Sequence, residues 1–104
     1  MPRYAVVEQS TDMQYRQTGV RFTTSLKTAR RWSEGSGGFT YSDPAVARNW
    51  HRTVARIYEL PLGWRRPGQT TLYREALRSR TSAYRKTDLD VLADIVRDVG
   101  REIV

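Results

Sequence analysis

A near-repetition between residues 22 and 50 does most to narrow the folds open to this chain. Residues 22–25 read Phe-Thr-Thr-Ser, and residues 39–42 read Phe-Thr-Tyr-Ser. Each stretch leads into a short run that ends in tryptophan, at 29–32 and at 47–50. Because β-branched and aromatic residues favour strands, each copy predicts a short strand, a helix cap and a brief helix. Two copies do not make a repeat array, which needs at least three.

The first copy has a capping residue and two distinct helix faces. Ser25 stands where an N-cap hydroxyl accepts a hydrogen bond from a first-turn amide. Lys27 and Arg31 lie four residues apart and so share the outer face. The inward face is predicted to comprise Leu26, Ala29 and Trp32.

The second copy has the same organisation with different capping residues. Asp43 is the predicted cap, and Pro44 occupies the first helical position, where its missing N–H is tolerated. Arg48 and Arg52 lie four residues apart on the outer face. The inward face is predicted to comprise Val46, Ala47 and Trp50. We therefore expect the tryptophan that ends each short helix to be a core residue.

Length and composition limit the classes of protein to consider. The chain has 104 residues, which is enough for one domain with one modest core. It has no cysteine, which excludes disulfides and zinc–thiolate sites. No apolar run approaches the roughly 18 residues of a membrane-spanning helix. The first residues lack an apolar signal core, so the sequence predicts a cytoplasmic protein.

The positive charge is unevenly distributed along the chain. The formal net charge is +7, and arginine outnumbers lysine heavily. Residues 87–104 are acidic on balance, so the excess of positive charge lies in residues 1–86. A strongly basic body predicts a polyanionic or acidic partner.

Four segments have the pattern of strands. Tyr4 to Val7 is apolar on both alternating faces, which is typical of an interior strand covered on both sides. Val20 and Phe22 share one face of a second predicted strand. The four predicted strands are 3–9, 20–24, 39–41 and 53–60.

The C-terminal part is predicted to be helical. Proline and glycine punctuate residues 61–69, which read as a stiff linker before a helical hairpin over 70–104. Arg80 falls within the apolar face of the first helix, so either its stem extends to solvent or the helix breaks within residues 79–82. That face is predicted to comprise Leu72, Tyr73, Ala76, Leu77, Ala83 and Tyr84.

The last helix has the strongest local signals. Thr87 and Asp90 form a capping box. The helix is predicted to pack on the sheet or its sister helix, and dimerisation through residues 89–103 is the alternative. Its apolar stripe is predicted to be Leu89, Leu92, Val96, Val99 and Ile103, widened by Val91 and Ile95, and its solvated face Asp90, Asp94 and Asp98.

These elements predict a single α+β domain. We expect a small mixed or antiparallel sheet of about four strands within residues 3–60, with two short helices packed on it and a C-terminal helical hairpin. No metal or cofactor site is expected, because His51 is the only histidine and no thiol exists.

The candidate binding residues are basic side chains that recur near aromatic ones. Such a set suits phosphate contacts along a nucleic acid. Trp64, in the linker beside two arginines, is the predicted exposed aromatic anchor. The full candidate set is Lys27, Arg31, Arg48, Arg52, Trp64, Arg65, Arg66, Arg74 and Arg78.

Three functions remain open from the sequence. The leading one is a non-enzymatic protein that binds DNA or RNA and acts as a regulator. The second is a protein-interaction module, such as an inhibitor, adaptor or phage-type accessory protein, that docks on an acidic partner. The third is a small ribonuclease that uses arginine with His51 and Glu59. One continuous basic face would favour nucleic acid, and scattered charges would favour ordinary solvated helices.

Overall fold

A computed structural model of the chain describes residues 2–10, 18–34, 53–78 and 86–104. The second predicted strand–helix copy at 39–52 lies outside the described residues. So do the predicted binding residues Arg48 and Arg52, the core candidate Trp50, and His51. The predicted disturbance around Arg80 also lies outside them.

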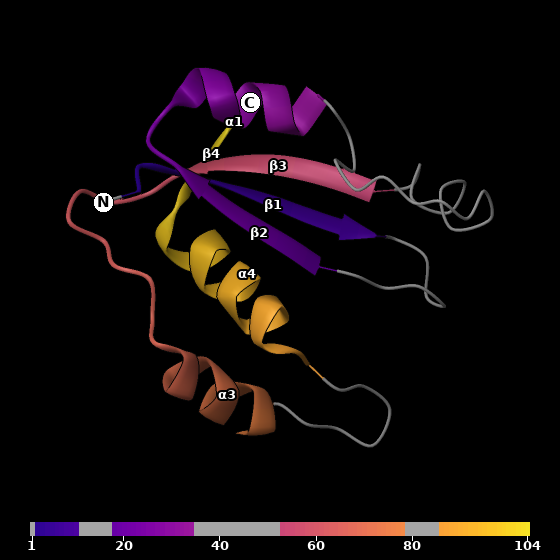
Figure 1. The fold of residues 1–104 in the computed structure, drawn as a ribbon, viewed down its shortest axis with the longest axis vertical. Coiled ribbons are helices and arrows are strands. Elements are labelled where there is room, and N and C mark those ends of the chain that lie inside the picture. The colour runs from indigo at the N-terminus through magenta and orange to yellow at the C-terminus, as the bar shows by residue number, and fades with distance from the viewer. Residues whose placement is uncertain (1, 11–17, 35–52, 79–85) are drawn as a thin grey trace.

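The described strands form one antiparallel sheet, which confirms the α+β class (Figure 1). The strands are β1 (Tyr4–Ser10), β2 (Thr18–Thr23), β3 (Thr53–Glu59) and β4 (Arg101–Ile103). Their order across the sheet is β2-β1-β3-β4. The N-terminal strand is therefore interior, as its sequence predicts.

Both faces of β1 are buried. Ala5 and Val7 point to one face, and Tyr4 and Val6 point to the other. All four side chains are buried, because a helix covers each face of the sheet. This arrangement explains why the strand has no polar face over its first four residues.

The helix α1 (Leu26–Glu34) covers one face of the sheet (Figure 1). The Ser25 hydroxyl accepts a hydrogen bond from the Thr28 amide at 3.2 Å, which confirms the predicted N-cap. Ala29 is fully buried against the sheet, with Leu26 and Trp32 packed beside it. The predicted inward face of this helix is thus correct. Its cluster on the sheet comprises Tyr4, Val6 and Ile57.

Two helices stack in succession on the other face. The helix α4 (Asp88–Val99) lies against the sheet, and α3 (Gln69–Arg78) lies against α4 on the side away from the sheet (Figure 1). Ala93 and Val96 of α4 pack on the sheet, whereas Val91 and Leu92 pack on α3. The order of layers is α1, sheet, α4, α3.

The C-terminal end of α4 differs from the prediction. The helix ends at Val99, and Gly100 turns the chain with an extended backbone (φ −87°, ψ 161°). Residues 101–103 then pair with β3, with Ile103 opposite Ile57. The helix predicted to reach Ile103 is therefore too long, because Gly100 ends it and a strand follows.

The buried side of α4 also differs from the predicted stripe. Leu89 and Val99 are each 40% exposed, although both were expected to face the core. Leu92 and Val96 are fully buried and Val91 is buried beside them, as predicted, and Ala93 is buried in addition. The reason is that α4 is covered on two sides, by the sheet and by α3, which leaves Leu89 and Val99 outside the two buried clusters. Dimerisation through residues 89–103 stays a prediction.

On α3, only part of the predicted apolar face is buried. Leu72 and Ala76 pack against α4, as expected. Tyr73 is 58% exposed and Leu77 is 42% exposed, which corrects their assignment to the core. One neighbouring helix covers only a narrow stripe of α3, and the residues beside that stripe remain in solvent.

Candidate nucleic-acid interface

Five of the described basic side chains are neutralised by carboxylates. One of these contacts joins Arg56 Nη1 of β3 to Glu102 Oε1 of β4 at 2.7 Å. Arg101 pairs with Glu59, and Arg78 pairs with Glu75. Lys86 and Arg97 share Asp94. A cation held in this way must exchange its carboxylate before it can bind a phosphate.

The other exposed basic side chains have no ion pair with a described residue. Six of them form two groups, and two further arginines lie on β2 and α3. The α1 cluster comprises Lys27, Arg30 and Arg31. The turn cluster comprises Arg3, Arg65 and Arg66. The remaining two are Arg21, which stacks on Trp32, and Arg74.

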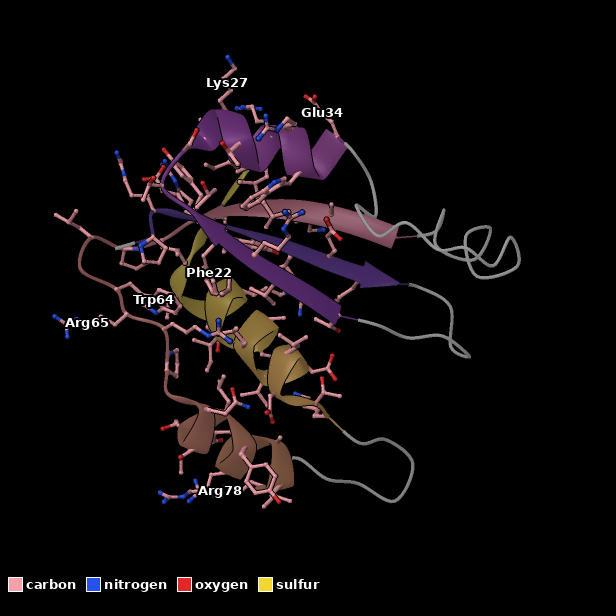
Figure 2. All side chains as sticks on the ribbon, viewed as in Figure 1. Phe22, Lys27, Glu34, Trp64, Arg65 and Arg78 are labelled. Carbon is pink, nitrogen blue, oxygen red and sulfur yellow. The ribbon has the colours of Figure 1, made fainter. Side chains whose placement is uncertain are left out.

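The α1 cluster lies on the outer side of its helix, opposite the buried Ala29. Lys27 is at the start of the helix and points away from the sheet (Figure 2). The first turn of α1 contains no acidic residue, so the positive end of the helix dipole is uncompensated there. The cluster lines an open depression of about 700 Å³, which also includes Glu34. Three cations against one carboxylate leave this surface positive.

The turn cluster lies at the end of the sheet where three strands converge. The Arg3 amide donates to the Thr23 carbonyl at 3.2 Å, and the Leu60 amide donates to the Arg3 carbonyl at 2.8 Å. These bonds place Arg3 beside the end of β2 and the end of β3. The linker that holds Arg65 and Arg66 leaves the sheet at the same end.

The two linker arginines are held differently. Arg65 points into solvent (Figure 2). The Arg66 guanidinium carbon lies 5.8 Å from the centre of the Phe22 ring, which is a cation–π distance. Packing on Phe22 limits the conformations of Arg66, whereas Arg65 stays free to follow a ligand.

Trp64 has a structural role that the sequence did not reveal. It is half-buried, in agreement with its predicted partial exposure. Its ring centre lies 5.6 Å from that of Phe22, and it packs against the clusters on both sides of α4. Trp64 therefore packs the linker against the core, and its ring is not free to stack on a ligand. The sequence could not show this, because the contact joins the linker to β2.

Trp32 lies at the edge of the core and carries an arginine. The Arg21 guanidinium carbon is 3.9 Å from the centre of the Trp32 ring. Arg21 pairs with Val6 across the sheet, so its side chain lies on the face covered by α1. The stacked guanidinium covers part of the tryptophan, which leaves Trp32 half-buried.

The predicted binding residues do not form one continuous face. Lys27 and Arg78 lie at opposite ends of the molecule, with the sheet and α4 between their helices (Figure 2). Arg74 is exposed on α3 with Arg78, which is paired with Glu75. The structure thus brings Lys27 and Arg31 together and places Arg65 and Arg66 near one end of the sheet, but it separates the α3 arginines from them.

Three unpaired cations, Arg3, Arg21 and Arg30, were missed by the sequence reasoning. Arg3 directly precedes β1, and that position alone indicates a place at the end of a sheet. Arg30 lies between Lys27 and the buried stripe of α1, three residues after Lys27. A helical-wheel count over the whole of α1 would have included it.

Glu8 is a buried carboxylate that the sequence did not single out. Its side chain is 1% exposed, and neither carboxylate oxygen has a hydrogen-bond partner among the described residues. Burial raises the pKa of Glu8, and the nearby charge of Arg21 opposes that rise. The residue lies opposite Gly19 on β2 and Ala55 on β3, two of the smallest neighbours a strand can have.

Asp90 is also buried, which corrects its assignment to a solvated face. The Thr18 hydroxyl of β2 donates to Asp90 Oδ1. The Thr87 amide donates to Asp90 Oδ2 at 2.9 Å, and the Asp90 amide donates to the Thr87 hydroxyl, so the predicted capping box is confirmed. The cap therefore also attaches α4 to the edge of the sheet.

Of the two residues named for a ribonuclease, only Glu59 lies in the described part of the chain. Glu59, one half of the predicted acid–base pair, is held by Arg101 at 3.3 Å. No group of three or more potential metal ligands occurs in the described part of the chain. Within the same residues, no helix is long and apolar enough to cross a membrane.

Comparison of the chain with protein-family models, with curated proteins and with solved structures finds no match.

Proposed function

We propose that this protein is a non-enzymatic nucleic-acid-binding protein whose contact surface combines the α1 cluster and the turn cluster. One observation supports this most strongly. Among the described basic residues, those with carboxylate partners lie outside the two clusters, whereas every member of the two clusters lacks one. Six of the eight described basic residues that lack a carboxylate partner are therefore gathered on these two surfaces, and Arg21 and Arg74 lie outside them.

The chemistry of phosphate binding favours such residues. An exposed, unpaired cation that contacts a phosphate releases a condensed counterion, and this release drives sequence-independent binding. Arginine can also bind two phosphate oxygens at once through its planar guanidinium. A cation that is already paired gains less, because its carboxylate repels the phosphate.

The two clusters are joined through the backbone of the sheet. The Thr23 carbonyl accepts from Arg3, and the cap of α1 follows two residues later. Lys27 then lies in the first turn of the helix. Along α1, Lys27 and Arg31 are separated by about 6 Å of helical rise. The backbone therefore brings Arg3 and the start of α1 to the same end of the sheet, with Arg66 on the face opposite α1.

A charge-removal experiment tests the proposal. The triple variant Lys27→Gln, Arg30→Gln, Arg31→Gln removes only exposed, unpaired cations. The matched control removes three exposed but paired cations: Arg56→Gln, Arg78→Gln and Arg101→Gln. Both variants lose the same formal charge, so the comparison separates location from total charge.

Fluorescence anisotropy over a salt series provides the measurement, with duplex DNA, single-stranded DNA and RNA of unrelated sequences. For duplex DNA, the cluster variant should reduce the slope of log affinity against log salt by up to about 2.7, at about 0.9 for each lost phosphate contact. The control should change it much less. An equal reduction of this slope in both variants would show that binding depends only on the total charge. No affinity of the intact protein at low salt would exclude the function.

A second function is favoured by a separate observation on α3. Tyr73 and Leu77 expose apolar surface next to the unpaired Arg74. This combination suits an acidic protein partner, for which this chain would be an adaptor or inhibitor. A pull-down with nuclease treatment separates the two functions: a partner that is retained after nuclease treatment and lost on Arg74→Gln favours protein binding.

A further inference from the structure

The turn between β3 and the linker has a fixed geometry. The Trp64 amide donates to the Pro61 carbonyl at 3.0 Å, which closes a four-residue turn. Gly63, at its third position, has φ 81°, as a type II turn requires. Both ends of the turn are anchored, because Leu60 is buried and Trp64 packs on Phe22. The residue at the second position is therefore presented on a rigid support.

That residue is Leu62, and its side chain is 98% exposed. A single exposed leucine is common on protein surfaces. The position of Leu62 is unusual, because it stands at the tip of an anchored turn within the turn cluster. Arg3 lines the same depression of about 270 Å³ as Leu62, and Arg65 and Arg66 follow three and four residues later.

The only acidic side chain that lines this depression, among the described residues, is already neutralised. Glu59 lines it together with Arg3 but is paired with Arg101 at 3.3 Å. The surroundings of Leu62 are thus positive on balance. An apolar tip within a positive rim is complementary to a duplex, in which charged backbones flank apolar, stacked bases.

We infer that Leu62 is a wedge that inserts between base pairs from the minor groove of duplex DNA. Proteins of this kind place leucine, isoleucine, phenylalanine, methionine or proline between base steps and kink the duplex toward the major groove. Arg3, Arg65 and Arg66 contact the phosphates on either side of the entry point. This assignment rests on the proposed function and specifies its substrate as duplex DNA that can be kinked.

The tip residue and its support have distinct roles in this binding mode. Gly63 permits the positive φ of the turn, and the Trp64–Pro61 hydrogen bond with the packed Leu60 and Trp64 restricts its backbone. Little conformational entropy is therefore lost when the Leu62 side chain enters the duplex. Pyrimidine–purine steps such as TA unstack most readily, so they are the expected insertion points. The preference of the protein for particular DNA sequences then comes from the deformability of the base steps and not from hydrogen bonds to bases.

Two readouts on one duplex test the wedge. The probe is a DNA duplex of about 20 base pairs with a central TA step, end-labelled for energy transfer and carrying 2-aminopurine at that step. The intact protein should bend it by an angle in the range of about 20–90° and increase 2-aminopurine fluorescence. Leu62→Ala should abolish both signals and leave the salt dependence of binding unchanged. Leu62→Phe should restore them.

The matched control is Leu77→Ala, which removes another exposed leucine on the remote helix α3. It should behave as the intact protein does. Binding without bending or unstacking, or a Leu62→Ala variant that still bends the duplex, would overturn the wedge and leave the proposed function standing. Absence of any affinity overturns both. If Leu62 bound an anionic lipid surface or a protein in place of duplex DNA, the intact protein would show no affinity for the duplex, and both proposals would be overturned.

Discussion

Val96 provides the sharpest test of the layered fold. Its side chain is 0% exposed and packs with Ala93 against the sheet. Val96→Asp places a carboxylate there, and no described basic residue belongs to that cluster. Its sheet-side neighbours are Ala5, Val7, Tyr58 and Leu60.

The expected loss is large relative to the stability of the whole domain. An uncompensated buried charge costs about 3–5 kcal/mol. Loss of the valine contacts adds to this, since burying an aliphatic side chain contributes about 1.5–3 kcal/mol. A domain of this size is stable by only about 5–15 kcal/mol. Val96→Asp should therefore leave the domain unfolded or close to unfolding at 25 °C.

Val99→Asp is the matched control, because Val99 belongs to the same helix and is 40% exposed. Surface substitutions of this kind usually change stability by less than about 0.5 kcal/mol. Urea denaturation, followed by tryptophan fluorescence and circular dichroism, measures both variants. Equal midpoints for Val96→Asp and Val99→Asp would refute the packing of α4 described above.

Two further changes test the core and the helix end. Burial raises the pKa of Glu8 above its ordinary value of 4.5, because the buried carboxyl group is favoured in its neutral form. The neutral group therefore stabilises the fold fully below pH 4.5, and this stabilisation is lost as the pH rises through the raised pKa. Glu8→Gln should therefore raise the melting temperature at pH 7 and change it little at pH 4, whereas the exposed Glu34→Gln should change neither. At Gly100 an added Cβ would lie 2.7 Å from the Val96 carbonyl oxygen, so Gly100→Ala should destabilise the domain, by about 1–3 kcal/mol for an overpacked site. Gly68→Ala has open space at the same position and should be tolerated; equal urea midpoints for the two would contradict the close approach at Gly100.

Features set by neighbouring residues could be predicted from the sequence. The Ser25 cap and the capping box of Thr87 with Asp90 depend on residues three positions apart, and both are present. The interior position of β1 followed from apolar residues on both of its faces. Such local signals report directly on backbone geometry, so a single sequence suffices to read them.

Features set by distant contacts could not be predicted. The strand after Gly100 exists because β3 offers an edge for pairing, and nothing in residues 101–103 indicates that edge. Asp90 is buried because Thr18 approaches from β2. Trp64 is fixed by Phe22, which is more than forty residues away in the sequence.

The candidate site was partly predictable for the same reason. The outward placement of Lys27 and Arg31 follows from the helical period and the buried position of Ala29. The pairing of Arg78 with Glu75 is also local and could have been used to rank Arg78 lower. The meeting of Arg3 with the start of the linker depends on the sheet register, which the sequence does not reveal.

The order of the layers has a consequence for how the domain opens. Among the described residues, the apolar contacts of helix α3 belong to one cluster, in which Leu72 and Ala76 meet α4, Val20, Phe22 and Trp64. Helix α4, in contrast, is held on two sides. Detachment of α3 exposes one of these clusters, whereas release of α4 breaks two. In hydrogen exchange, the amide protons of α3 should accordingly exchange through a sub-global opening, whereas those of α4 and β1 should exchange only through global unfolding. Tyr73 and Arg74 thus belong to the unit that opens first, and Leu62 lies on the segment that tethers it.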